Sequence, residues 1–123
     1  MMAKLYKITK NLNHENAAEI LTEKLEIAES FFARAKGLLG RKNLDLDQAL
    51  WIKPCNNIHT FFMKFKIDCV FINKNNQVEK IFSNVAPFCI KGPVWRATSV
   101  IEFSAGFIES SNIKIGDQLY VVS

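Results

Sequence analysis

Cys55 and His59 stand four residues apart and are the pair of side chains in this sequence best suited to covalent or metal chemistry. An imidazole beside a thiol can take up its proton and so create a thiolate nucleophile. The same two groups can ligate a metal ion, but zinc sites use three or four protein ligands, and the other candidate ligands are remote in the sequence. We therefore expect no metal site, and we favour a structural role for this pair over a catalytic one.

Two acidic residues, Asp68 and Glu102, each interrupt a run of apolar residues that is typical of a strand. A carboxylate in such surroundings is costly to bury unless it is paired or accepts hydrogen bonds. The two could act as general acid and general base, or one of them could bind a polar ligand. The alternative, which we favour, is that each lies on a solvated strand face or accepts hydrogen bonds from backbone N–H groups or from Arg41.

Basic residues flank the two glycines of the Gly-Leu-Leu-Gly segment, at Arg34, Lys36, Arg41 and Lys42. Neither of the glycine-rich phosphate-binding motifs is present, so this segment predicts no nucleotide site. The forked donors of Arg41 suit a fixed pairing with a buried acid or with a ligand carboxylate. A surface cation near a helix end is the simpler interpretation.

The elements that would position these residues are mainly short strands. Apolar and polar residues alternate over residues 58–72, which predicts a long strand with one buried face and a bend or break near residues 65–66. This alternation includes Met63. Further strands are expected at residues 4–9, 25–27, 49–52, 78–82, 100–103 and 119–122, with turns at 73–76 and 116–117.

Helix signals are few. Ser30 predicts the N-terminus of one short helix near residues 31–39, which glycines at 37 and 40 would loosen or end. A brief helix capped by Asn13 is also expected over residues 15–21. Short strands with frequent turn signals favour a mainly β fold, either a small antiparallel β-sandwich or a partly open barrel.

Composition indicates one ordered domain, since 49% of the 123 residues are hydrophobic and 23% are charged. No apolar run approaches the roughly 18 residues of a membrane span. The N-terminal residues lack the pattern of a secretory signal, so we expect a cytoplasmic protein. The three cysteines are odd in number and form no CxxC motif, which predicts reduced, mostly buried thiols.

Positive charge gathers in the middle of the chain, where residues 30–96 hold eleven Lys or Arg against four Asp or Glu. These cations are scattered singly, with no basic run of five or more. We therefore favour a solvated basic surface and expect no nucleic-acid partner. We also expect a monomer without a cofactor.

A series of motifs resembles the domain-of-unknown-function family 192. They are Gly-Leu-Leu-Gly-Arg at 37–41, Pro-Cys at 54–55, Ile-His-Thr-Phe-Phe-Met at 58–63, Ile-Asp-Cys-Val-Phe-Ile at 67–72, Val-Ile-Glu-Phe-Ser-Ala-Gly at 100–106 and Ile-Lys-Ile-Gly-Asp at 113–117. The resemblance covers residues 24–122, and we predict an N-terminal extension over residues 1–23 before a β-rich domain over 24–123. It implies a compact, sandwich-like bacterial or archaeal domain, exported in some members, and it implies no activity.

Three functions are consistent with these observations. The favoured one is a non-enzymatic module that binds a small ligand or a peptide in a groove lined by Trp51, Phe61 and Met63. The others are an accessory domain that docks on another protein, and an enzyme that uses Asp68 with Glu102 or Cys55 with His59. The residues proposed for ligand binding are Arg41, Cys55, His59, Met63, Asp68 and Glu102.

Overall fold

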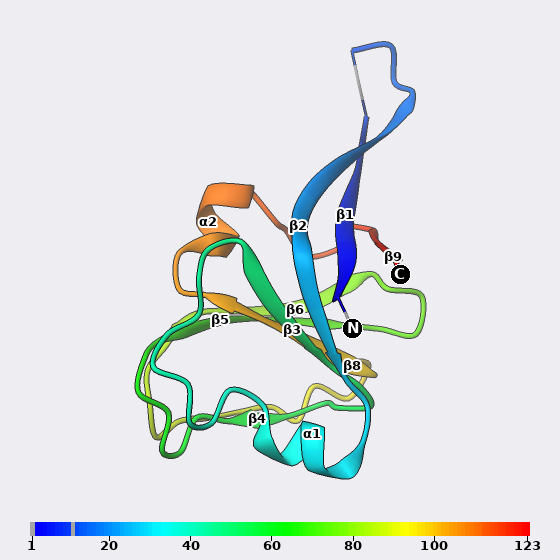
Figure 1. The fold of residues 1–123 in the computed structure, drawn as a ribbon. Coiled ribbons are helices and arrows are strands. Elements are labelled where there is room, and N and C mark those ends of the chain that lie inside the picture. The colour runs from blue at the N-terminus through cyan, green and yellow to red at the C-terminus, as the bar shows by residue number, and fades with distance from the viewer. Residues whose placement is uncertain (1, 11) are drawn as a thin grey trace.

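The computed structural model describes residues 2–10 and 12–123, and within them a mixed seven-stranded sheet, a two-stranded sheet and two short helices (Figure 1). A mainly β fold is therefore confirmed. The elements are β1 (Met2–Lys10), β2 (Asn16–Ala28), α1 (Phe31–Lys36), β3 (Gln48–Ile52), β4 (Ile58–His59), β5 (Ile67–Ile72), β6 (Val78–Val85), β7 (Ile90–Lys91), β8 (Ser99–Ser104), α2 (Phe107–Ser111) and β9 (Leu119–Val122).

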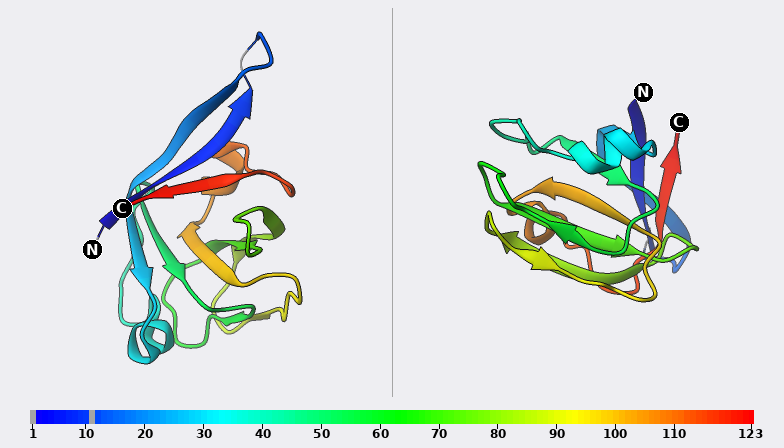
Figure 2. Two further views of the ribbon diagram at one scale, coloured as in Figure 1. Left: turned by 90° about the vertical axis from the view of Figure 1, so that its right-hand side faces the viewer. Right: turned by 90° about the horizontal axis from the view of Figure 1, so that it is seen from below.

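The large sheet has the strand order β6-β5-β8-β3-β2-β1-β9, while β4 pairs with β7 apart from it. Its neighbours are antiparallel except β2 and β3, because the connection over residues 29–47, which contains α1, returns the chain to the same end of the sheet. The sheet curves without closing (Figure 2), and its two edge strands approach each other at an isolated bridge between Gln77 and Gln118. The expected antiparallel sheet is thus interrupted by one parallel pair.

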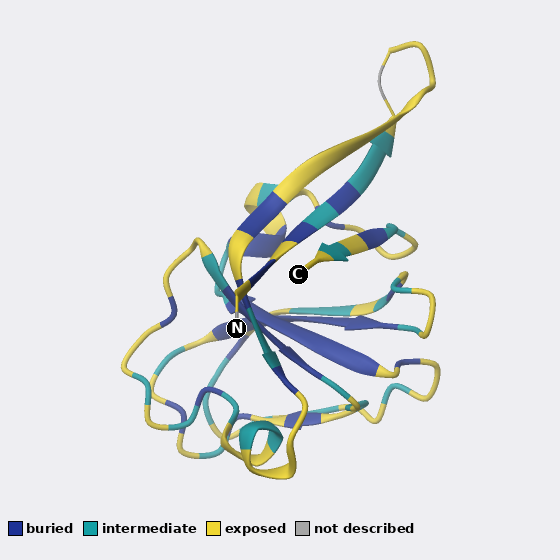
Figure 3. Ribbon diagram, turned by 45° about the vertical axis from the view of Figure 1, so that its right-hand side comes forward, coloured by how far each residue is buried: buried dark blue, intermediate teal, exposed yellow. Residues whose placement is uncertain are grey.

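Apolar side chains cover both faces of the central strands, and α1 and α2 lie on opposite sides of the sheet (Figure 1). Side chains alternate between the faces, so Val70 and Ile72 pack with Phe107 and Ile108 of α2 on what we call the α2 face. The opposite side is called the α1 face, where the buried residues include Leu38, Leu50, Ile58, Met63, Cys69 and Phe71. Figure 3 shows the central strands buried and the outer half of β2 exposed, whereas the neighbouring part of β1 is buried or half-buried.

The long strand expected over residues 58–72 is wrong in its extent. The structure has β4 and β5 at its two ends and a loop over residues 60–66, so the expected break near 65–66 is confirmed. The buried Thr60 organises this loop, because its hydroxyl donates to the carbonyl of Ala86 at 2.6 Å and accepts from the N–H of Cys89 at 2.9 Å. These bonds tie the loop to residues 86–89 instead of continuing a ladder.

The N-terminal region forms the β1–β2 hairpin. The first strand is confirmed, whereas the helix expected over residues 15–21 is wrong, because β2 pairs with β1 through Tyr6 opposite Ile20 and Ile8 opposite Ala18. Pairing with β1 has overridden the helix propensity of this short segment, of which only Leu21 is buried. The domain boundary at residue 23 stays a prediction, and β2 runs continuously across it.

Both helices begin at recognisable residues. The Ser30 hydroxyl accepts from the N–H of Ala33 at 3.1 Å, which confirms the predicted start of α1. The helix ends before Gly37, whose φ of +48° and ψ of −125° favour glycine. The sequence did not predict α2, which follows Gly106 at φ +94°. No helix in the described part of the chain is long and apolar enough to cross a membrane.

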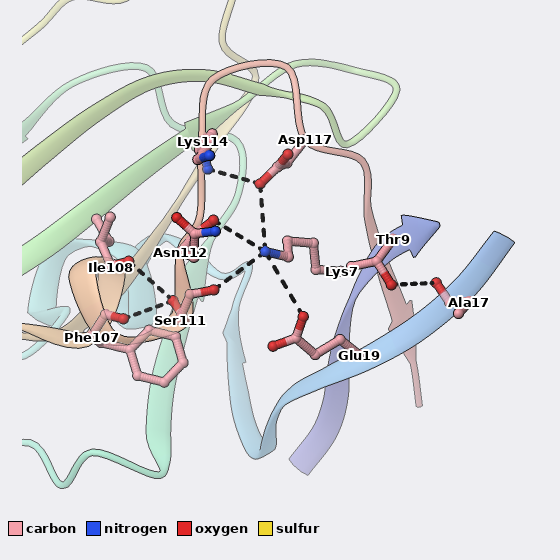
Figure 4. A network of polar contacts seen from close by, with 10 residues as sticks. All are labelled: Lys7, Thr9, Ala17, Glu19, Phe107, Ile108, Ser111, Asn112, Lys114 and Asp117. Carbon is pink, nitrogen blue, oxygen red and sulfur yellow. Dashed lines mark hydrogen bonds and ion pairs between the residues drawn. The ribbon is translucent and has the colours of Figure 1, made fainter. Parts of the chain in front are cut away.

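Lys7 of β1 connects the hairpin to the end of α2 (Figure 4). Its ammonium group is buried, donates to the carbonyls of Ser111 at 3.3 Å and Asn112 at 3.1 Å, and lies 3.9 Å from Glu19 and 4.0 Å from Asp117. The last carbonyls of a helix have no partner within the helix, so a cation there satisfies them. This interior role of Lys7 was not predicted.

Candidate functional site

A cavity of about 260 Å³ lies between α1 and the α1 face of the sheet. We call it the α1 cavity. Its walls come from α1, the loop after it, the end of β3, the segment around β4 and one residue of β8. Its lining is largely apolar and includes Leu38, Leu39, Ile52, Ile58 and Met63, and the polar groups that reach it include Arg34, Cys55, His59 and Glu102. Four of the six candidate residues, Cys55, His59, Met63 and Glu102, thus line one cavity.

Glu102 is the carboxylic acid of this cavity. It lies on β8 between Leu50 of β3 and Cys69 of β5, and it is 4% exposed. No described residue makes a hydrogen bond to its carboxyl group. Burial raises its pKa to about 7, partly opposed by the positive charge of Arg41. Glu102 is therefore poised near neutrality to accept or to donate a hydrogen bond.

Arg34 reaches the α1 cavity from the helix. Its Nη1 donates to the carbonyl of Pro54 at 3.2 Å, which attaches α1 to the segment before β4. Its Nε is buried, and no hydrogen-bond partner for it exists within the described residues. Arg34 was expected only as one of several cations in a basic segment, since the burial of one guanidinium nitrogen has no sequence signal.

Cys55 and His59 both line the cavity without forming the arrangement of a nucleophile and its base. The Cys55 thiol donates to the carbonyl of Asn57 at 2.9 Å, whereas the exposed His59 ring stacks on Phe61 at 5.2 Å between centroids. Burial is the main cause that raises the pKa of the Cys55 thiol; Glu102 raises it further, while the Asn57 bond and Arg34 oppose this. The thiol is therefore stabilised in its protonated form.

Asp68 lies on the α2 face, away from this cavity. Its side chain is fully buried and accepts from the backbone N–H groups of Asn84 at 2.8 Å, Gly106 at 3.1 Å and Ile108 at 3.0 Å. These bonds join β5 to β6 and to the beginning of α2. The structure does not bring Asp68 to the same site as Glu102, so the two acids cannot work as one acid–base pair.

Arg41 and Trp51 also lie apart from the cavity lining. The Arg41 guanidinium donates to the Glu26 carboxylate at 2.7 Å. It makes no hydrogen bond to Glu102, and only its positive charge acts on that carboxyl group. Trp51 packs on the α2 face and donates from its indole N–H to the hydroxyl of Ser99 at 2.8 Å. The expected groove of Trp51, Phe61 and Met63 is therefore wrong, and of the three only Met63 lines the α1 cavity.

An exposed group of rings begins at His59, and we call His59, Phe61, Phe62 and Phe88 the aromatic row. Phe88 contacts Phe61 at 6.3 Å and Phe62 at 5.8 Å between ring centroids. Phe62 and Phe88 are 76% and 64% exposed, and both have a positive φ, of 64° and 63°. Bulky side chains rarely adopt this conformation, so two neighbouring loops hold these rings toward solvent.

Within residues 2–10 and 12–123, no group of three or more His, Cys, Asp or Glu side chains is arranged to hold a metal ion.

Comparison with known sequences identifies a family match over most of the chain. The model of the family described as DUF192, "Uncharacterized ACR, COG1430", matches residues 12–121. The UPF0127 protein PH1112 of Pyrococcus horikoshii is 32% identical over 90% of this chain and 92% of its own. A UPF0127 protein of Thermococcus sibiricus is 28% identical over 88% of this chain and 72% of its own.

Solved structures of bacterial proteins share the fold. A protein of unknown function from Novosphingobium aromaticivorans has a TM-score of 0.79 at 18% identity, covering 97% of this chain and 84% of its own. A protein from Sinorhizobium meliloti described as a putative transcription regulator has a TM-score of 0.76 at 17% identity, covering 97% and 93%. At such low identity the likeness concerns the fold.

Proposed function

This chain belongs to the DUF192 family of uncharacterised proteins, and from that premise we propose that its α1 cavity binds a small organic ligand carrying a hydrogen-bond donor. The observation that carries this proposal is the Glu102 carboxyl, 4% exposed, lining the cavity and receiving no hydrogen bond from the described residues. A carboxyl group that is largely removed from water and has no partner in the protein gains from a bound hydrogen-bond donor.

The shape and chemistry of the cavity support ligand binding. Small-molecule sites are concave and mostly apolar, with a small number of polar groups that orient the ligand. Here the apolar side chains of Leu38, Ile52 and Met63 accompany the polar groups of Arg34 and Glu102. A cavity of about 260 Å³ suits a compact metabolite, and its opening among exposed side chains such as Phe31 gives access.

Binding is favoured over catalysis by the same geometry. A nucleophilic cysteine needs a lowered pKa and a neighbouring base, whereas the pKa of Cys55 is raised and its thiol donates to a backbone carbonyl. The two carboxyl groups of an acid–base pair must meet at one substrate, and Asp68 and Glu102 lie on opposite faces of the sheet.

The test is a fragment screen of the whole chain, followed by thermal unfolding and by two-dimensional amide NMR. The panel contains matched amines, alcohols, amides, carboxylates and sugars. A ligand at a hundred times its dissociation constant stabilises the folded state by about 2.7 kcal/mol. We expect donor-bearing fragments to raise the unfolding midpoint and to shift the amide resonances of residues 34–39 and 55–59.

Two variants and one control make the screen specific. Glu102→Gln should weaken these fragments about tenfold by changing the acceptor. Ala35→Trp should weaken them because Ala35 is exposed and lines the cavity, so a large side chain blocks the site without disturbing the core. Glu109→Gln, on the exposed surface of α2, should leave binding unchanged. If Glu102→Gln and Ala35→Trp both bind the fragments as tightly as the wild type does, the proposal is refuted.

A second candidate function, docking on a partner protein, is favoured by the aromatic row. Exposed rings held in an unfavourable backbone conformation are a feature that a contact surface would use. Lys64 and Lys66 follow Phe62 in the same loop, so the partner surface that fits is apolar and rimmed by Asp or Glu. Acidic aromatic peptides should lose affinity with Phe62→Ser and Lys64→Glu but not with Ile20→Ser on the hairpin. Equal effects of all three would exclude this surface.

A further inference from the structure

Three charged side chains line the α1 cavity: Glu102, Arg34 and the exposed Lys36. Glu102 and Arg34 are not paired with each other. Glu102 lines the cavity as a carboxyl that receives no hydrogen bond within the described residues. Arg34 lines it as a guanidinium that makes one hydrogen bond, to the carbonyl of Pro54, and no described carboxylate forms an ion pair with it. One acceptor and several N–H donors are therefore available to a ligand.

Glu102 and Arg34 reach the cavity from separate elements, β8 and α1. No ion pair joins them among the described residues, and Arg41, which lies outside the lining, is hydrogen-bonded to Glu26. Cys55 lines the same cavity as both groups. The pKa of its thiol is raised mainly by burial; Glu102 raises it further and Arg34 lowers it.

Apolar side chains form the rest of the lining that a ligand would contact. Leu38, Ile52 and Met63 are each less than 8% exposed and line the cavity together with Glu102. A ligand that reaches both charges must therefore present uncharged carbon atoms to these walls. The volume of about 260 Å³ limits it to a small molecule.

We propose that the ligand is a small zwitterion whose primary ammonium group binds Glu102 and whose carboxylate binds Arg34, with a short apolar carbon skeleton between them. This inference rests on the ligand-binding function proposed above. An ammonium group supplies three donors to a carboxylate, and a guanidinium fork matches a ligand carboxylate. A simple amine would leave Arg34 without a counterion, and a simple carboxylate would leave Glu102 without a donor.

Matched probes test this inference by calorimetry on the whole chain at pH 8, where Glu102 is mostly ionised. 5-Aminopentanoate, which has four methylene groups between its ammonium and its carboxylate, is compared with butylamine and pentanoate, which each keep one of its two charged groups. γ-Aminobutyrate is compared with propylamine and butyrate in the same way. We expect at least one zwitterion to bind about tenfold more tightly than both of its counterparts.

Single substitutions separate the two ends of the ligand. Glu102→Gln should weaken the zwitterion and the amine about tenfold and leave the carboxylate unchanged. Arg34→Met should weaken the zwitterion and the carboxylate and leave the amine unchanged. Lys42→Met, an exposed cation outside the cavity lining, is the control for loss of positive charge and should change none of them.

The inference is overturned if neither zwitterion binds more tightly than its counterparts, or if both variants weaken all three types of probe alike. Donor-bearing fragments of another class that still bind at Glu102 would then leave the ligand-binding function standing. If no fragment of any class binds in the α1 cavity, both the ligand-binding function and the zwitterion inference are overturned.

Discussion

Asp68 and Glu102 occupy neighbouring strands of one sheet and point to opposite faces of it. In the β5–β8 ladder Asp68 is opposite Phe103 and Cys69 is opposite Glu102, so the two acids are one step out of register. Because side chains alternate along a strand, this single step separates a carboxylate surrounded by backbone donors from a carboxyl group that lines a cavity. Two acids in similar apolar sequences therefore have different surroundings.

The first prediction concerns Asp68. Asp68→Asn should lower the free energy of unfolding by about 3 kcal/mol, because an amide replaces one acceptor oxygen with donors that face backbone N–H groups. Urea unfolding monitored by circular dichroism measures this, with the exposed Asp45→Asn as control. An unchanged midpoint would contradict the assignment of Asp68 as a buried structural anchor.

The second prediction concerns the pH dependence caused by Glu102. Its carboxyl ionises at the ordinary value of 4.5 in the unfolded chain and at about 7 in the folded one. Between these values the folded chain keeps a proton that the unfolded chain has lost, so stability falls as the pH rises through this window. At about 1.4 kcal/mol per pH unit, the loss amounts to roughly 3 kcal/mol.

Urea unfolding of the wild type and of Glu102→Gln between pH 4 and pH 9 measures this contribution. The glutamine cannot ionise, so the difference between the two proteins should shrink or reverse in favour of the variant above pH 7. Parallel curves for the two proteins across this range would show that Glu102 titrates normally.

The sequence was a good guide where local patterns decide the structure. The strands at residues 49–52 and 100–103 and the turn after β5 were predicted because apolar runs end at clear turn residues. The acids at 68 and 102 were singled out because a charge within an apolar run is unusual. Ser30 was recognised as a helix start because its hydroxyl can accept from the first turn.

Features that depend on distant parts of the chain were not predictable in the same way. Cys55, His59 and Glu102 line one cavity because β3 and the residues after it pair with β8 and the residues before it, about fifty positions away, which no local pattern shows. The helix α2 has five residues, too few for a helical period, and begins where Asp68 receives its N–H groups. The sequence of residues 60–66 alternates between apolar and polar residues as a strand would, but the segment is a loop because Thr60 bonds to Ala86 and Cys89.

The third prediction tests whether Cys55 is an activated nucleophile. Because the pKa of its thiol is raised, Cys55 should react slowly with iodoacetamide near pH 7, and its rate should rise only at a higher pH than that of a free cysteine. Mass spectrometry of a Cys89→Ser protein follows the reaction, since Cys69 is fully buried. Adding Glu102→Gln should shift the rate profile to lower pH. Rapid alkylation below pH 7 would instead favour the thiolate enzyme.

The fourth prediction concerns Lys7, whose ammonium group joins β1 to the end of α2. Lys7→Met keeps most of the side-chain volume but leaves the carbonyls of Ser111 and Asn112 without this donor, so the free energy of unfolding should fall by about 2 kcal/mol. Lys4→Met, an exposed lysine on the same strand, should change it by less than about 0.5 kcal/mol. Hydrogen exchange should also quicken at α2 in the Lys7 variant alone. Equal stability of the two variants would mean that the buried contacts of Lys7 contribute no more than a surface charge.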